Sequence, residues 1–452
     1  MSKAVLFVVL GAAVVAAVLL LLPRDGNEAA LPGSSLDTAP NIMLVGIDGL
    51  DWDRVNRLAD EGRMPNIAGM RRDGASGILM SIPPFVSPTI WTSIATGKVS
   101  DKHGIEGFIV NVPAEGETAP TTSNMRRARA VWQILSAAER RVGVVGWLVT
   151  YPADTVNGYL VSSHATLALC ADESSRAPNQ TDEWLAKGVY PPELWHEVKD
   201  NSLSENDISD SVLEKLLAGP LSVARAEEPV RVKSLARFCA FDITSLELAR
   251  HFEAEMPSNF TTVYLRGTDM ASHFFWRFME PETWSKKLSE EAIKTLSPVV
   301  DRYYAMADSI LGEMMALADE NTVVMVCSDH GFAGHRGYTG FEGDVAVGVQ
   351  MHRAEGVLFA AGPGIKAGGR VEGATVLDIT PTILALSGLP VARDMDGRPL
   401  SEMLEAPFLN RFPVDYIETY EVERAGDGDE APIESPVDEE IKEMLRSLGY
   451  ID

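Results

Sequence analysis

Short apolar runs alternate with amphipathic stretches over most of the chain. Three of these runs are followed closely by an aspartate. They are residues 42–47 before Asp48, Thr261–Leu265 before Asp269, and Thr322–Cys327 before Asp329. A continuous apolar run of this length is typical of a strand buried on both faces of a parallel sheet. We predict strands at all three positions, and two more at Arg141–Val149 and Gly356–Ala361.

Stretches with helical periodicity lie between the predicted strands. They are Leu58–Arg72, interrupted at Pro65, then Val131–Arg140 and Ser297–Ala318. Alternating strands and helices predict an α/β fold with a doubly wound, mostly parallel sheet. Ligands of such folds bind beyond the carboxyl ends of the strands. The three aspartates should therefore meet at one edge of the sheet.

The first residues are strongly apolar. As a helix, Ala4–Leu22 would span about 28 Å, close to the thickness of a bilayer core. We favour a membrane anchor in residues 1–24 over a cleaved signal segment, because the run exceeds a usual signal core and no A-x-A site follows it. Lys3 before the run favours a cytoplasmic N-terminus. Either interpretation exports the rest of the chain. With an anchor, it would be a single-pass protein of the cell membrane.

Composition divides the remainder into regions. Residues 25–40 are rich in Gly, Ser, Pro and Ala and are predicted to be a linker. Residues 41–400 carry the strand and helix patterns and form the predicted catalytic domain. Within them, roughly 150–240 is poorly patterned, and we interpret it as an inserted cap. Residues 401–452 form a predicted acidic tail that ends in a short amphipathic stretch, Ile441–Tyr450.

The net charge of the chain limits which molecules it can bind. The 452-residue chain has a formal net charge of −26, which argues against a nucleic-acid partner bound through a broad basic surface. A small anionic substrate remains compatible, because bound divalent cations reverse the local field. No CxxC spacing occurs among the three cysteines, so a thiolate metal site is not expected. Cys327 is predicted to be a buried thiol, and the sequence leaves open whether Cys170 and Cys239 pair.

Two motifs combine carboxylate with imidazole. They are Asp269-x-x-x-His273 and Asp329-His330. Such ligands suit zinc or manganese. Taken alone, each pair is weak, since Asp and His near loops are more often solvated or capping groups. The shared strand-end position of the aspartates makes the combination stronger.

A hydroxyl motif occurs at Ser87-Pro88. Ser before Pro indicates a helix N-cap, with a helix running to Thr96 before Gly97. A cap alone would explain the motif. The same geometry would place the hydroxyl at the positive end of the helix dipole, where a phosphate can bind. A metal ion could then make Ser87 a nucleophile, with Thr89 as the alternative.

Several other polar residues are assigned ordinary roles. Asp51 is expected to cap the helix that follows it. His103 and His335 lie near the motifs, and we favour structural roles for both. His164 is interpreted as an ordinary polar residue.

The ordered motifs resemble a known family. They are Ile47-Asp48-Gly49-Leu50, Ser87–Gly97 followed by Lys102-His103-Gly104, Asp269-x-x-x-His273, Ser328-Asp329-His330-Gly331, His352 before Gly362-Pro363-Gly364, and Asp378-Ile379-Thr380-Pro381. In this order they resemble the alkaline phosphatase superfamily, and most closely its type I phosphodiesterase / nucleotide pyrophosphatase branch. The resemblance covers roughly residues 41–400.

The resemblance implies a catalytic centre with two divalent metal ions, zinc in preference to manganese. It places one ion on Asp48, Asp329 and His330, with the Ser87 oxygen as a further ligand. It places the other on Asp269, His273 and His352. It also makes Ser87 the nucleophile that attacks a small-molecule phosphoester. We therefore expect a phosphodiesterase or nucleotide pyrophosphatase-like hydrolase that forms a covalent Ser87 intermediate.

Two departures from the family bear on the substrate. Nucleotide pyrophosphatases typically carry Thr-Phe-Pro-Asn at the nucleophile, and Ile90 stands here in place of the Asn that holds a phosphate oxygen. No Arg lies near Ser87 in a C/S-x-P-x-R context, which disfavours a sulfatase. A phosphomonoesterase or a phospho-headgroup transferase is the alternative enzyme, and a silent binding ectodomain is the alternative outside enzymes.

Overall fold

A computed structural model describes residues 38–112, 117–172, 181–283, 287–334, 351–421, 431–435 and 437–448. In this part of the chain, nine strands form one central sheet. Their spatial order is β13 (Gly369–Thr375), β2 (Ala75–Met80), β12 (Glu355–Ala361), β9 (Thr322–Cys327), β1 (Asn41–Ile47), β8 (Phe260–Leu265), β5 (Val142–Val145), β6 (Gly158–Val161) and β7 (Val189–Tyr190).

The centre of the sheet is parallel. β1 pairs in parallel with β9 on one side and with β8 on the other, and β5 and β6 continue the parallel run. β12 is antiparallel to both of its neighbours, and β7 is antiparallel to β6. The predicted doubly wound, mostly parallel sheet is thus confirmed. All residues of β8, and all but the first of β1 and β9, are buried, as their apolar composition predicts.

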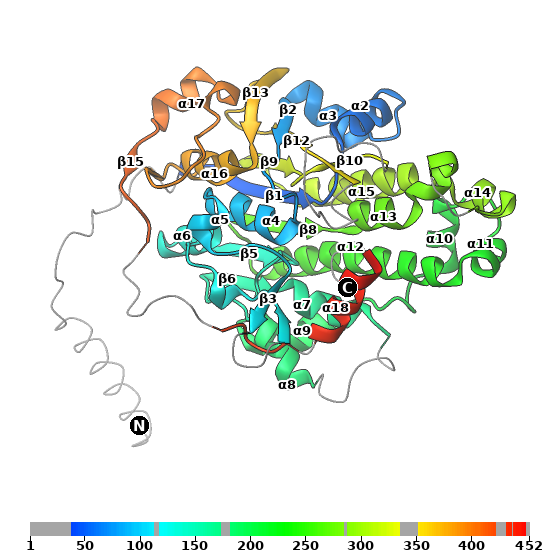
Figure 1. Cartoon of the computed structure of the whole chain (residues 1–452). Coiled ribbons are helices and arrows are strands. Elements are labelled where there is room, and N and C mark those ends of the chain that lie inside the picture. The colour runs from blue at the N-terminus through cyan, green and yellow to red at the C-terminus, as the bar shows by residue number, and fades with distance from the viewer. Residues whose placement is uncertain are drawn as a thin grey trace, which may run out of the picture.

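Helices cover both faces of the sheet (Figure 1). On one face, α12 (Pro229–Glu255) packs on β8 and β5, and α13 (Gly267–Met279) and α15 (Val299–Met315) pack beside it. α2 (Trp52–Asp60) and α3 (Pro65–Asp73) continue this layer over β12. The opposite face carries α4 (Ser87–Thr96), α6 (Val131–Ala137) and α16 (Ile379–Leu386). Two layers around one sheet give a continuous core.

The helix boundaries differ from those predicted at two places. The predicted interruption at Pro65 separates α2 from α3, but α2 begins at Trp52 and not at Leu58. Ser87 is the first residue of α4 and not its N-cap, which is Val86; no side-chain cap bond forms there. The helix ends at Thr96 as predicted, since Gly97 adopts the left-handed conformation at φ 69°. Asp51 caps α2 as expected, accepting from the N–H of Arg54 at 3.0 Å.

The region interpreted as a cap contributes to the sheet. β6 and β7 both lie within residues 150–240, and α7 (Ser163–Cys170) follows β6 directly. The sequence interpretation missed these short strands because their apolar runs are only a few residues long. The domain boundaries themselves remain predictions.

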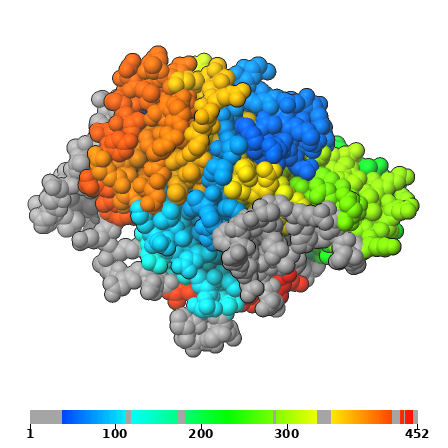
Figure 2. Space-filling model, turned by 45° about the horizontal axis from the view of Figure 1, so that its top comes forward, coloured from blue at the N-terminus to red at the C-terminus, as the bar shows by residue number. Residues whose placement is uncertain are grey.

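The C-terminal segment folds back over the body. α18 (Asp438–Leu448) occupies the predicted amphipathic stretch and packs beside β4 (Glu117–Pro120), which forms a hairpin with β3 (Ile109–Val112). In the space-filling view, the red of α18 lies next to the cyan of this hairpin, although the two are far apart in the sequence (Figure 2).

The predicted anchor, residues 1–24, and the linker lie outside the described residues, except for the linker's last three. Among the described helices, none has the length and apolar composition needed to cross a membrane. The three cysteines are buried, and all are free thiols, so Cys170 and Cys239 do not pair in this structure.

Candidate active site

The carboxyl ends of β1, β8 and β9 bring the three predicted aspartates together. Asp48 follows β1 directly, Asp269 lies in the first turn of α13 after β8, and Asp329 follows β9. All three are buried. The chain turns sharply after Asp48, where Gly49 has a φ of 68° and a Cβ would lie 2.9 Å from Asp269 Cβ. A glycine is therefore required for the close approach of these two strand ends.

One group of ligand atoms combines Asp269 with His273 and His352. The Asp269 Oδ1 lies 3.3 Å from His273 Nε2 and 3.5 Å from His352 Nε2. His273 lies one helical turn after Asp269 on α13, so both side chains project from the same face. His352 begins β11 (His352–Arg353), which pairs with β10 (Gly331–Phe332). This group gathers the three residues predicted for one metal ion.

A second group combines Asp48, Asp269 and His330. The His330 Nε2 lies 3.5 Å from Asp48 Oδ1 and 3.3 Å from Asp329 Oδ2, so Asp329 adjoins the group. The ring of His330 stacks on that of His352 with centroids 3.6 Å apart, which joins the two groups. All six predicted ligands therefore belong to one continuous cluster.

Hydrogen bonds fix the tautomers of two histidines. His330 Nδ1–H donates to the Gly331 carbonyl at 3.0 Å, and His352 Nδ1–H donates to the Phe85 carbonyl at 2.9 Å. A carbonyl can only accept, so Nδ1 carries the proton in each ring. The Nε2 lone pairs are left facing the cluster, as metal ligation requires.

Three neighbours orient Asp48. The Oδ2 atom accepts from Tyr264 Oη at 2.5 Å and from Trp91 Nε1 at 3.1 Å. The Asp48 carbonyl accepts from the Thr268 hydroxyl. Trp91 packs edge-on against both Trp147 and Tyr264, which holds its indole in place. Asp48 Oδ1 is thereby left free to face the cluster.

Burial and neighbouring charges shift the pKa values of the cluster residues. Burial, reinforced by Asp269, raises the pKa of Asp48 to about 6, and burial with the Asp48 and Asp269 charges raises the pKa of Asp329 well above its usual value. Burial would also raise the pKa of Asp269, yet His273 and His352 outweigh it and hold that pKa well below its ordinary value. Burial lowers the pKa of His330 and His352 to about 4, so these rings are neutral near pH 7.

The donor set fits divalent metal ions. Asp48 Oδ1, Asp269 Oδ1, Asp329 Oδ2 and His330 Nε2 are buried and lack a hydrogen-bond partner. Orphaned polar atoms of this kind are costly unless something binds them. In the described part of the chain, no Lys or Arg forms an ion pair with the three carboxylates. Mixed carboxylate and imidazole ligands suit zinc or manganese.

Ser87 lies in a cavity that also exposes the cluster. The cavity has a volume of about 60 Å³ and includes Asp48, Ser87, Tyr264, Arg266 and Asp269 in its wall. Since Ser87 sits in the first turn of α4 and does not cap it, the hydroxyl is not committed to the helix backbone. Thr89, the alternative nucleophile, is buried with an unpartnered hydroxyl and is not part of this wall.

Sequence reasoning missed other parts of the cavity wall. His164, interpreted as an ordinary polar residue, lies in the wall and bonds to Ser435 Oγ at 2.9 Å. Ile441 and Met444 of α18 close the cavity from the C-terminal end. Val149 also contributes, with a φ of 56° that is unusual for a β-branched residue. His103 has the structural role expected, bonding to Ser93 Oγ at 2.9 Å, and His335 lies outside the described residues.

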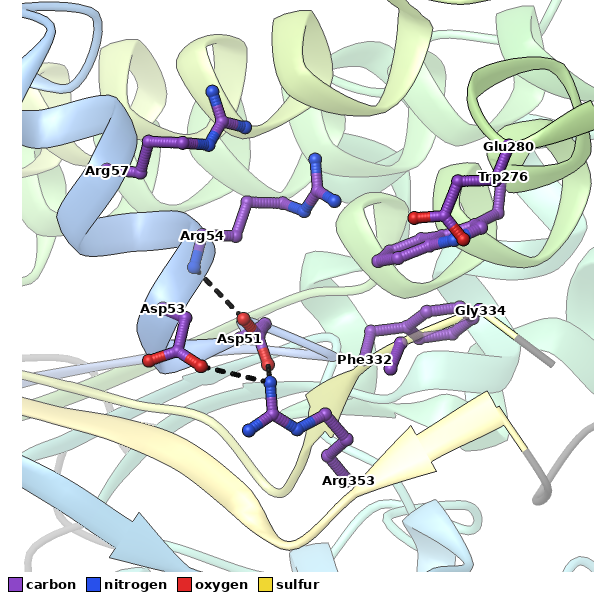
Figure 3. A pocket seen from close by; sticks show the side chains of 10 residues that line it. Asp51, Asp53, Arg54, Arg57, Trp276, Glu280, Phe332, Gly334 and Arg353 are labelled. Atoms are coloured by element: carbon purple, nitrogen blue, oxygen red, sulfur yellow. Dashed lines mark hydrogen bonds and ion pairs between the residues drawn. The ribbon is translucent and has the colours of Figure 1, made fainter. Parts of the chain in front are cut away.

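A second cavity, of about 460 Å³, is lined by residues of α2, α13, β10 and β11. Figure 3 shows its three arginines. Arg353 points at Asp51 and Asp53, with contacts of 3.1 and 3.2 Å. Arg54 and Arg57 both pair with Asp301. Each of these cations already has a carboxylate partner.

Tyr264→Phe tests the support of Asp48. The substitution removes the hydroxyl donor to Asp48 Oδ2 without emptying the core. Loss of such an outer hydrogen bond typically lowers metal affinity about 10- to 100-fold, and we expect a loss of that size in competition with a zinc-buffering chelator. Tyr159→Phe is the matched control, since Tyr159 is equally buried and donates to Glu253 at 2.9 Å away from the cluster. Equal affinities for the two variants would contradict this role.

One family of known proteins matches most of the chain. Residues 42–372 match the family described as type I phosphodiesterase / nucleotide pyrophosphatase. Human arylsulfatase K is 31% identical over 123 residues, which is 25% of this chain and 22% of that protein. The chain thus spans about a fifth of the length of the relatives it matches.

A solved structure shows the same fold. A putative sulfatase from Bacteroides thetaiotaomicron superposes with a TM-score of 0.51 at 14% identity, covering 81% of this chain and 74% of that one. Murine ectonucleotide pyrophosphatase / phosphodiesterase 5 gives 0.47 at 12% identity, covering 81% of this chain and all of that one. The family match spans well over half of the 452 residues, so the protein belongs to the type I phosphodiesterase / nucleotide pyrophosphatase family.

Proposed function

We propose that this protein is a metal-dependent hydrolase of phosphate esters, with phosphodiesters as its preferred substrates and Ser87 as its nucleophile. The observation that carries the proposal is the convergence of six ligand side chains in one cluster, two of which, Asp48 and Asp269, share a cavity wall with Ser87. Asp48, Asp329 and His330 would hold one ion, and Asp269, His273 and His352 the other. The family match supports this assignment.

Two divalent cations, when bound, supply Lewis-acid charge that activates a hydroxyl and stabilises a leaving oxygen. The chain itself supplies the nucleophile and its orientation. The Ser87 hydroxyl loses its proton and Oγ attacks phosphorus in line, so that an Oγ–P bond forms while the P–O bond to the leaving group breaks and the leaving oxygen takes up a proton to depart as the alcohol. Water then attacks the phosphoseryl intermediate, breaks the Oγ–P bond and returns the serine hydroxyl.

The cavity favours this order of events. Ser87 is buried, and Tyr264 and Trp91 hold Asp48 in a fixed position beside it. Prepositioned groups contribute to catalysis because the substrate does not have to organise them. The apolar wall formed in part by Leu148, Leu167 and Met444 keeps bulk water from the intermediate.

The substrate class is tested with three nitrophenyl esters. Zinc-loaded protein is expected to hydrolyse bis(p-nitrophenyl) phosphate with the highest kcat/KM, p-nitrophenyl phosphate more slowly, and p-nitrophenyl sulfate least. Preference for the monoester would favour the phosphomonoesterase alternative. Turnover of the sulfate alone, or of none of the three by fully metallated protein, would overturn the proposal.

A further inference from the structure

Arg266 differs from the other arginines near the cluster in what its guanidinium contacts. The residue precedes α13 and lies in the wall of the Ser87 cavity. Its Nη2 contacts Met444 Sδ at 2.7 Å and Met270 Sδ at 3.4 Å. Within the described residues, the guanidinium forms no ion pair with a carboxylate. Thioether sulfur is a weak acceptor, so this cation lacks a strong partner.

The arginines of the second cavity differ from Arg266 in their partners. There, Arg353 pairs with Asp51 and Asp53 (Figure 3). Arg54 and Arg57 pair with Asp301. An anion entering that cavity would have to displace an existing ion pair. An anion entering the Ser87 cavity would displace only sulfur contacts from Arg266.

Arg266 is also held in position by contacts that do not engage its guanidinium N–H groups with an anion. Its backbone N–H donates to Asp242 Oδ1 at 3.0 Å, and its guanidinium carbon lies 5.4 Å from the ring centroid of Phe241. Asp242 also receives the Tyr303 hydroxyl at 3.1 Å. These contacts hold the backbone and the guanidinium of Arg266, which reduces the entropy lost when the guanidinium binds a ligand.

The remaining donors of the cavity wall are few. The Tyr264 hydroxyl is committed to Asp48. Thr121 donates its hydroxyl to the Gly107 carbonyl at 2.7 Å, and Ser163 offers only a neutral hydroxyl. His164 is buried against Tyr151, and its Nδ1 bonds to Ser435. Arg266 is therefore the strongest hydrogen-bond donor available to an oxyanion among the described residues of this wall.

We propose that Arg266 binds a non-bridging oxygen of the phosphoester at Ser87 and so acts as a specificity-determining residue for a phosphoryl anion. The proposal rests on the proposed function. Substrate oxygens replace the Met444 and Met270 sulfur contacts as the phosphoryl group enters. The planar guanidinium can contact two oxygens at once, which an ammonium group cannot reproduce.

The test uses the full-length, zinc-loaded protein and inorganic phosphate as the probe. Phosphate binding is measured by calorimetry for wild type, Arg266→Gln, Arg266→Lys and the control Arg57→Gln. The control arginine lies in the second cavity and pairs with Asp301 and Glu61. We expect Arg266→Gln to weaken phosphate binding about 10- to 100-fold, the loss of one or two charge-assisted hydrogen bonds. Arg266→Lys should recover only part of this loss, and Arg57→Gln should match wild type.

A purely structural role for Arg266 predicts a different pattern. It would lower the Tm through the contact with α18 and leave the phosphate Kd of the folded variant unchanged. A phosphate Kd within twofold of wild type for Arg266→Gln, at equal zinc content, overturns the proposal. If that variant does not fold, Arg266→Lys decides the matter, since a Kd equal to wild type would have the same meaning.

Steady-state kinetics separate this inference from the function it rests on. With bis(p-nitrophenyl) phosphate, Arg266→Gln should raise KM and lower kcat/KM about 10-fold or more. If wild type binds phosphate through Arg266 but hydrolyses no phosphoester, the proposed function fails and the anion site stands. If wild type is active and Arg266→Gln matches it in both KM and phosphate Kd, the anion site fails and the function stands.

Discussion

Ser87→Ala is expected to lower kcat for phosphoester hydrolysis by at least about 10³-fold while leaving the zinc content unchanged. The reason is that the hydroxyl forms the Oγ–P bond, and no other described hydroxyl occupies the same place at the start of α4. The six proposed metal ligands do not depend on it, because they come from other elements. Metal analysis of the purified variant and single-turnover kinetics measure the two effects separately.

Thr89→Ala is the matched control for this experiment. Thr89 lies on the same helix and is as buried as Ser87, but it does not form part of the cavity wall. We expect its kcat to stay within a few-fold of wild type. If Thr89→Ala were inactive and Ser87→Ala retained most of its activity, the covalent mechanism through Ser87 would be wrong.

Removing the metal ions should abolish turnover and lower the thermal stability of the domain. An ion present at about 1,000 times its Kd stabilises the folded state by about 4 kcal/mol. For a chain of this size, two such ions correspond to a fall in Tm of roughly 5–10 °C after chelation. Differential scanning fluorimetry with and without chelator measures this fall, and restoring zinc should reverse it. An unchanged Tm and undiminished activity after complete metal removal would contradict the two-ion site.

The fall in Tm on metal removal should depend on pH. Burial raises the pKa of Asp48 to about 6 in the ion-free protein, above the unfolded value of 3.8. The folded state therefore binds a proton more tightly, so this contribution is fully present below pH 3.8 and is lost as the pH rises through about 6. Asp269 acts in the opposite sense, and its contribution is lost as the pH falls through its depressed pKa. Chelation should therefore lower the Tm more at pH 8 than at pH 5.

Much of the scaffold could be predicted from local sequence. The runs that became β1, β8 and β9 are uniformly apolar because both faces of each strand are covered, and this pattern needs no partner to be recognised. The carboxyl ends of these strands were enough to predict where Asp48, Asp269 and Asp329 lie. Residue spacing did not predict that His352 lies at this edge of the sheet. Only the family resemblance predicted it.

The cavity wall could not be predicted in the same way. α18 reaches the cavity from the C-terminal end of the chain, and its periodicity indicates an apolar face without saying what that face covers. His164 and Arg266 have no motif of their own, and only the packing of α7, α13 and α18 brings them to Ser87. Long-range contacts of this kind are absent from local patterns.

The three aspartates proposed as metal ligands lie just beyond three adjacent strands at the centre of the sheet, whereas α7, α18 and the β3–β4 hairpin, which lie outside that centre, contribute to the wall of the Ser87 cavity. The two parts of the site can therefore evolve independently. Substitutions in the outer elements can reshape what enters the cavity without moving a ligand of the ions. Among related proteins, sequence differences should concentrate in the peripheral helices and hairpins. The residues at the strand ends, which carry the reaction chemistry, should be retained.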